Sequence, residues 1–235
     1  MTSTTNAVCV AAIVLLALFR IYLTMRKRKV VRIGELADGT EVYVRREGAV
    51  RELVLTHGED ELVQSRSDGS GYVKEFHRAM RATPKPQRIL FLGGGACIGP
   101  MSFEKRYADA TIDVVEREEL IAEAAKKHFD FRETERMKLH VEDVREFLPK
   151  AQPYDLVILD LYDARGIPPS LTTPEFFATV RAVVSPGGTL VANLFRPADQ
   201  TILDAIAAAF PDCPLDVQDV TADNALVFAA TTNVI

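Results

Sequence analysis

The sequence predicts an α/β protein built on an open, mostly parallel β-sheet. An apolar strand at 88–92 runs straight into a glycine-rich loop at 93–99, which is how such sheets begin a nucleotide pocket. Three further predicted strands, 111–116, 138–141 and 154–160, end on or are followed at once by acidic residues. Because the carboxyl ends of parallel strands meet at one edge of a sheet, these loops and acids are expected to line a single pocket.

The region after the fourth predicted strand continues the alternation of helix and strand. Helices are expected at 174–184 and 199–210, on either side of a strand at 189–193. A closing hairpin is predicted through Asp216-Val-Gln218 and Leu226-Val-Phe-Ala229. The catalytic domain therefore comprises residues 84–235, with a seven-stranded, mostly parallel sheet that ends in an antiparallel hairpin.

A small antiparallel sheet is expected ahead of this domain. Residues 31–36, 40–45 and 51–55 alternate apolar and polar side chains, and turn signals at Asp38-Gly39 and His57-Gly58 separate them. A helix is predicted at 71–82, and the prolines that follow it mark a domain boundary. These elements form a second unit, residues 30–83.

The first 29 residues predict a membrane anchor. Residues 7–25 are apolar apart from Arg20, a length that is about enough to cross a bilayer, and the basic segment 26–29 follows. Positive charge on the C-terminal side of the apolar segment predicts a single-pass protein whose catalytic body faces the cytoplasm. The alternative is a buried or interfacial amphipathic helix, because Arg20 shortens the uninterrupted apolar segment.

Charge and cysteine usage exclude several classes of function. The whole chain has a net charge of −5, yet the first 30 residues hold five basic and no acidic side chains, which leaves 23 basic against 33 acidic residues in the rest. A body this acidic repels nucleic acid and favours cationic small molecules. The three cysteines are isolated, with no histidine at ligand spacing, so neither a disulfide framework nor a metal site is expected.

The predicted pocket is lined by glycine and acid. The loop carries no cation of its own, and its glycine spacing departs from the dinucleotide pattern, which argues against hydride transfer. Glu116 lies about 20 residues beyond the loop, where an acid can accept the ribose hydroxyls of a nucleoside. The expected ligand is therefore a nucleoside that carries positive charge.

Six segments in this order resemble the spermidine synthases, and more narrowly their bacterial membrane-linked relatives. The resemblance covers about residues 40–230 and rests on the following segments: Gly93-Gly-Gly95, Val115-Glu116, Glu142-Asp143, Tyr154 to Asp163, Leu171 to Phe177, and Ser185 to Asn193. It implies a Rossmann-like, class I methyltransferase fold. It also implies S-adenosylmethionine or its decarboxylated form as co-substrate, without a metal.

The resemblance also assigns roles by position. Asp160 would be the catalytic carboxylate that faces an acceptor amine, and Glu116 and Asp143 would bind the ribose and the adenine amine of the nucleoside. The remaining donor-binding residues would be Gly93, Gly94 and Gly95, and the acceptor-binding residues would be Asp163, Tyr162, Gln64, Tyr72 and Glu75. The expected partners are a small cationic amine, a membrane engaged by the N-terminal helix and, as one option, a second copy of the chain in a homodimer.

Departures from the family pattern keep three functions open. Ala96 stands where the family carries an acid that selects decarboxylated S-adenosylmethionine, and the loop after Asp160 reads Leu-Tyr-Asp instead of Ser-Ser-Asp. An aminopropyltransferase-like enzyme is favoured by the ordered motifs, and a methyltransferase by Ala96. A non-catalytic nucleoside-binding membrane protein is favoured by the altered acceptor motif. The structural alternative for Asp160 and Asp163 is that they only cap the turn before Gly166-Ile-Pro168.

Overall fold

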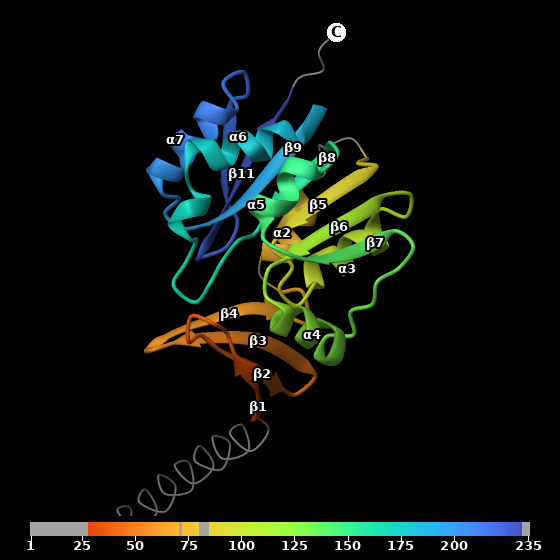
Figure 1. Cartoon of the computed structure of the whole chain (residues 1–235), viewed down its shortest axis with the longest axis vertical. Coiled ribbons are helices and arrows are strands. Elements are labelled where there is room, and N and C mark those ends of the chain that lie inside the picture. The colour runs from red at the N-terminus through yellow and green to blue at the C-terminus, as the bar shows by residue number, and fades with distance from the viewer. Residues whose placement is uncertain (1–27, 71, 80–84, 232–235) are drawn as a thin grey trace, which may run out of the picture.

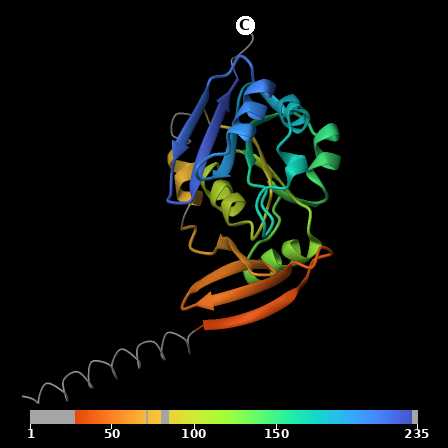
Figure 2. The same ribbon diagram turned by 90° about the vertical axis from the view of Figure 1, so that its left-hand side faces the viewer.

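The computed structural model describes residues 28–70, 72–79 and 85–231. A four-stranded antiparallel sheet comes first, in the order β1-β2-β3-β4, and a seven-stranded sheet follows, in the order β10-β11-β9-β8-β5-β6-β7. Figure 1 shows the small sheet at the lower end of the molecule, beyond helix α4, and Figure 2 shows it as a separate layer. The elements of the small unit are β1 (Arg28–Glu35), β2 (Glu41–Glu47), β3 (Val50–His57), β4 (Asp60–Arg66) and α2 (Tyr72–Ala79).

The large sheet is parallel except for one strand. β5, β6, β7, β8 and β9 run in the same direction, β11 is antiparallel to β9, and β10 is antiparallel to β11. The predicted α/β class, the parallel strands and the closing hairpin are thus confirmed. The strands are β5 (Arg88–Leu92), β6 (Thr111–Glu116), β7 (Met137–Val141), β8 (Tyr154–Leu159), β9 (Val184–Phe195), β10 (Leu215–Asp219) and β11 (Asn224–Ala230).

Helices cover both faces of this sheet, and the alternation of side chains along β5 shows how. Leu90 and Leu92 point into a core that α5, α6 and α7 cover, whereas Ile89 and Phe91 point into a second core beneath α3. Both cores are required because a parallel sheet is apolar on each face. The helices are α3 (Ile98–Arg106), α4 (Glu119–His128), α5 (Val144–Phe147), α6 (Pro174–Ala182) and α7 (Gln200–Ala209), with 3₁₀ turns η2 (Leu148–Lys150) and η3 (Pro169–Leu171).

The small sheet packs on α4 through a third apolar cluster. Val42, Leu53 and Leu55 of the sheet meet Ile121 and Phe129 at the two ends of this helix. This sheet has four strands where the sequence predicted three. The strand that was missed, β4, carries only two neighbouring apolar side chains among polar ones, so it lacks a period-2 pattern, and its pairing with β3 supplies the strand conformation.

The predicted membrane anchor, residues 1–29, lies outside the described residues except for Arg28 and Lys29, which begin β1. No helix among the described residues has the length and apolarity needed to span a bilayer. The predicted helix 71–82 is described only as α2, and β9 begins five residues before the predicted strand 189–193. The division at residues 29 and 83 stays a prediction.

One glycine fixes how closely the first loop approaches β8. Gly93 has a φ of +98°, and a Cβ atom placed on it would lie 2.1 Å from the backbone oxygen of Asp160. The main chain therefore passes directly beside the end of β8, which only glycine permits. This contact sets the position of the whole loop relative to Asp160.

We predict that Gly93→Ala destabilises the protein much more than Gly39→Ala. Both glycines have positive φ, but a Cβ atom at Gly39 would meet nothing within 4 Å. The strain of positive φ costs about 1–2 kcal/mol at either position, and the clash with Asp160 adds about 1–3 kcal/mol at Gly93 alone. The free energy of unfolding of each variant, obtained from the slope and midpoint of its urea unfolding curve, measures the difference. Equal losses would contradict the close approach.

Candidate active site

The glycine loop is held from inside by a buried carboxylate. Glu116, at the end of β6, is 7% exposed, and its Oε2 accepts hydrogen bonds from the N–H groups of Gly94 (3.2 Å) and Gly95 (2.9 Å). Its Oε1 accepts from the N–H of Glu118 at 3.0 Å. Burial raises the pKa of Glu116, and the three N–H groups act in the opposite direction by stabilising the charged form.

These bonds bear on the predicted role of Glu116. An ionised carboxylate can accept about four hydrogen bonds. Three backbone N–H groups already donate to the Glu116 carboxylate. One ribose hydroxyl can therefore bind directly. A second ribose hydroxyl can bind Glu116 only if the longest of the three hydrogen bonds, from the Gly94 N–H, breaks.

The small sheet holds the same loop from outside. The N–H of Ala96 donates to Ser65 Oγ at 3.1 Å, and the Gln64 side chain lies against Gly95, where a Cβ atom would be 2.7 Å from Gln64 Oε1. Both residues come from β4, the strand that the sequence did not predict. Gln64 was a predicted site residue, whereas Ser65 was missed because a lone serine on an irregular strand carries no pattern.

Asp143 has a partner that sequence reasoning did not assign. It caps α5 by accepting from the N–H of Arg145, and the guanidinium of Arg145 binds both of its carboxylate oxygens, at 2.9 and 2.7 Å. Arg145 thereby holds the pKa of Asp143 below its usual range. An adenine amine at this position would share the carboxylate with Arg145.

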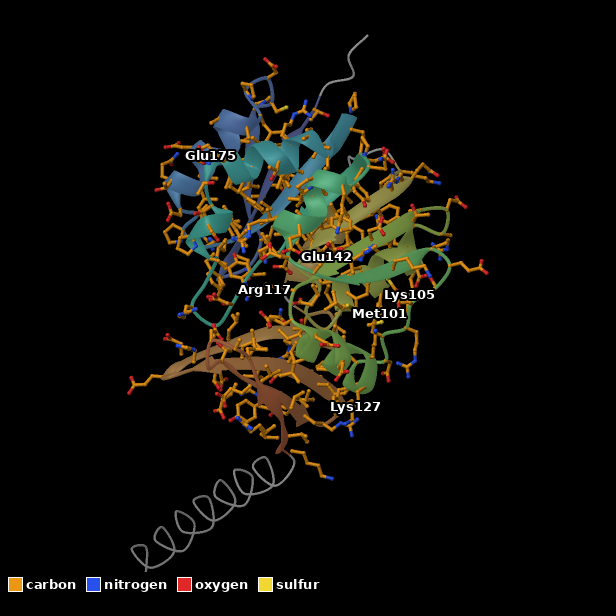
Figure 3. The ribbon with its side chains drawn as sticks, viewed as in Figure 1. Met101, Lys105, Arg117, Lys127, Glu142 and Glu175 are labelled. Atoms are coloured by element: carbon orange, nitrogen blue, oxygen red, sulfur yellow. The ribbon has the colours of Figure 1, made fainter. Side chains whose placement is uncertain are left out.

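A first cavity lies between the carboxyl end of the large sheet and the small sheet. Figure 3 labels Arg117 and Glu142, which follow β6 and β7 in this region. The predicted site residues that line this cavity are Gln64, Gly93, Glu116, Asp143, Asp160, Tyr162 and Asp163. The structure thus brings together residues from five separate segments of the chain.

A second cavity adjoins the first, since the two share lining residues. Its walls include the four loop glycines, Gly93, Gly94, Gly95 and Gly99, and the aromatic residues Phe76, Phe91 and Phe195. Four residues line both cavities, namely Gln64, Gly93, Asp160 and Tyr162. A molecule in one cavity can therefore meet a molecule in the other beside the Asp160 carboxylate.

Asp160 and Tyr162 are held by β9. Asp160 Oδ1 accepts from Asn193 Nδ2 at 2.9 Å, and the Tyr162 hydroxyl donates to the backbone oxygen of Asn193 at 2.9 Å. The Tyr162 ring packs on Phe195 with centroids 4.3 Å apart. Burial and the charge of Asp160 raise the pKa of Tyr162, so the phenol stays neutral and remains a donor.

The structure describes one of the three other predicted acceptor residues, Asp163, in full. Asp163 lines the first cavity and not the second, and its carboxylate accepts from the N–H of Arg165 at 2.8 Å. Arg165 in turn reaches Asp38 of the small sheet at 3.2 Å. Tyr72 and Glu75 lie on α2, but their side chains are outside the described part of the structure. Their roles stay predictions.

No group of three or more His, Cys, Asp and Glu side chains in residues 28–70, 72–79 and 85–231 is arranged to hold a metal ion. Cys97, in the glycine loop, is fully buried, and burial raises the pKa of its thiol.

Comparison with known proteins identifies the family. Residues 75–202, more than half of the chain, match the family model of the spermine/spermidine synthase domain. The chain belongs to the spermine/spermidine synthase domain family. This match contains the glycine loop, Glu116, Asp143, Asp160 and Asn193, but it begins after the small sheet.

Curated relatives include transferases of two kinds. The polyamine aminopropyltransferase of Vibrio vulnificus is 31% identical over 128 residues, which are 53% of this chain and 43% of the relative. That of Halorhodospira halophila is 32% identical over 52% of this chain and 46% of the relative. The eEF1A lysine and N-terminal methyltransferase of Bos taurus is 27% identical over 58% of this chain and 23% of the relative. The matches thus span less than half of these relatives.

Solved structures support the fold. The spermidine synthase of Thermotoga maritima superposes with a TM-score of 0.67 at 18% identity, covering 85% of this chain and 72% of that one. Human methyltransferase-like protein 13, in complex with SAH, superposes with a TM-score of 0.59 at 24% identity, covering 67% and 82%. The chain therefore has the Rossmann-like methyltransferase fold, with a mixed main sheet and an antiparallel sheet ahead of it.

Proposed function

We propose that this protein transfers an aminopropyl group from decarboxylated S-adenosylmethionine to a small cationic amine. The observation that carries the proposal is the position of Asp160, whose side chain lines both cavities. A transferase needs its donor and acceptor to meet at one point, beside a group that can take a proton. The family match and the aminopropyltransferase relatives support the same reaction.

In this proposal the first cavity holds the nucleoside. Glu116 accepts a ribose hydroxyl, Asp143 accepts from the adenine amine beside Arg145, and the loop glycines allow the sulfonium to approach the main chain. The lining contains six carboxylates, those of Asp38, Glu116, Glu118, Asp143, Asp160 and Asp163. This negative surround favours a cationic donor.

The second cavity then holds the acceptor amine. Its aromatic side chains suit a methylene chain, and Asp160 and the neutral Tyr162 hydroxyl lie at the boundary with the first cavity. Asp160 takes a proton from the ammonium, and the free nitrogen lone pair attacks the carbon of the aminopropyl group next to sulfur. The C–N bond forms as the C–S bond breaks, and methylthioadenosine leaves with the electron pair as a neutral thioether.

A methyltransferase is the second candidate, and Ala96 favours it. Ala96 is fully buried and its N–H is bound to Ser65, so this position offers no carboxylate to attract a donor amine or to repel a donor carboxylate. Ordinary S-adenosylmethionine then meets no repulsion at this position, and two methyltransferases are among the relatives. The acceptor amine and Asp160 would have the same roles.

We predict that Asp160→Asn abolishes most transfer while it leaves nucleoside binding intact. Asparagine retains the shape and the hydrogen bond to Asn193 but cannot take a proton, so the rate should fall about 100-fold or more. The assay incubates the full chain with each donor and a series of linear diamines, and mass spectrometry identifies methylthioadenosine and the modified amine.

Asp216→Asn, on the exposed edge strand β10, is the matched control and should transfer at the wild-type rate. If the product is a methylated amine formed from ordinary S-adenosylmethionine, the protein is a methyltransferase and the aminopropyltransferase proposal fails. Absence of any product with either donor would leave a binding protein without chemistry.

We also propose that residues 7–25 anchor the protein in a membrane, with the catalytic body facing the cytoplasm. The support is the sequence alone: an apolar segment followed by four consecutive basic residues, 26–29. The homodimer stays a prediction.

The anchor predicts that the full chain remains in the membrane pellet after extraction with alkaline carbonate. An integral helix resists this treatment, because its apolar side chains stay in the hydrocarbon layer, whereas a surface-bound helix is released. Replacing Leu15 and Leu16 by Arg provides the comparison, since charge at the centre of the segment opposes insertion. Release of the unmodified chain into the supernatant would reduce the segment to a peripheral helix.

A further inference from the structure

Asn193 is a buried polar side chain on an apolar strand. It lies near the carboxyl end of β9 between Ala192 and Leu194, and it is only 1% exposed. Burying an amide costs free energy unless each of its polar groups finds a partner. The partners of Asn193 therefore show what the amide does at this position.

The side chain of Asn193 and its backbone oxygen bond to residues that line the second cavity. Its Nδ2 donates to Asp160 Oδ1 at 2.9 Å, and its Oδ1 accepts from Asn224 Nδ2 at 3.1 Å. Its backbone oxygen accepts from the Tyr162 hydroxyl at 2.9 Å. The strand order β11-β9-β8 explains the arrangement, because Asn224, Asn193 and Asp160 lie at neighbouring strand ends.

The chain of hydrogen bonds has one direction. The Thr221 hydroxyl donates to Asn224 Oδ1 at 3.2 Å, while its oxygen accepts from the N–H groups of Asp223 and Asn224 at 3.2 and 3.0 Å. Asn224 must then present its NH₂ group to Asn193, and Asn193 must present its own NH₂ group to Asp160. Every donor in the series points toward the carboxylate, and such series strengthen their members.

We propose that Asn193, supported by Asn224, is a positioning residue for Asp160 that keeps the carboxylate ionised and turns one of its oxygens toward the acceptor amine. This inference rests on the proposed function, in which Asp160 takes the proton. Asn193 binds Oδ1 from the neighbouring strand β9 and so fixes the orientation of the carboxylate. A donor to the charged form stabilises that form, so the amide also sets the pH range in which Asp160 can act.

The test compares pH profiles of kcat/KM for the wild type, Asn193→Leu and Asn193→Asp. Without the amide donor the ionised carboxylate is less stable, so Asp160 becomes protonated at higher pH and activity is lost earlier on acidification. The acid limb should move up by roughly one pH unit in Asn193→Leu, the equivalent of one charge-assisted hydrogen bond. It should move further in Asn193→Asp, since two adjoining carboxylates resist ionising together.

Two further measurements separate positioning from general damage. The value of kcat should fall more than the KM for the amine rises, and the affinity for methylthioadenosine, measured by calorimetry, should stay within twofold. Asn224→Ala should give a smaller shift of the same sign. Thr189→Val is the matched control on β9, because Thr189 is also buried, at 6% exposure, but lies outside both cavities, and it should leave the acid limb in place.

An unmoved acid limb in folded Asn193→Leu and Asn193→Asp would overturn the proposal and leave Asn193 a structural residue. If Asn193→Leu does not fold, the near-isosteric Asn193→Asp and Asn224→Ala decide the question. If the wild type transfers no aminopropyl group, the proposed function fails separately. Carbon-13 NMR titration of the Asp160 carboxyl, assigned with Asp160→Asn, then tests the inference without turnover: equal titration midpoints in wild type and Asn193→Leu would contradict it.

Discussion

The close approach of Gly93 to the end of β8 is the constraint on which the site depends. Because Gly93 has no side chain, the Asp160 backbone oxygen can lie beside it. A Cβ atom on residue 93 would be only 2.1 Å from that oxygen. The glycine loop and the Asp160 carboxylate thereby form the shared wall of two cavities. A wider separation would divide the two cavities and place the donor carbon away from the group that handles the proton.

Three carboxylates at this edge, those of Glu116, Asp143 and Asp160, have different partners, and these partners indicate what each carboxylate does. Backbone N–H groups hold Glu116, a guanidinium holds Asp143, and a neutral amide holds Asp160. Glu116 thus maintains the loop as well as offering an acceptor to ribose, and Asp143 is neutralised by Arg145. The amide that holds Asp160 carries no charge and comes from the neighbouring strand β9, which suits a group that must both gain and lose a proton.

The sequence predicted the strands of the main sheet well because parallel strands are continuous apolar segments that end in acids and glycines. It did not predict the partners of those acids. The bond from Asn193 to Asp160 depends on β9 lying next to β8, and that order is set by packing over the whole domain. Asp163 follows Asp160 by three residues, yet the turn that Arg165 stabilises directs it to the first cavity only. Strand β4 was missed for lack of a period-2 pattern, although it supplies both Gln64 and Ser65.

The central claim is that the first cavity binds a nucleoside at Glu116, and calorimetric titration of the full chain with methylthioadenosine tests it most directly. The account predicts saturable binding by the wild type and at least tenfold weaker binding by Glu116→Ala, because the variant leaves a ribose hydroxyl and the loop N–H groups without their acceptor. Glu118→Ala, next in the same lining, keeps the backbone N–H that Glu116 uses and controls for general loss of charge. Equal affinity in wild type and Glu116→Ala would contradict the account.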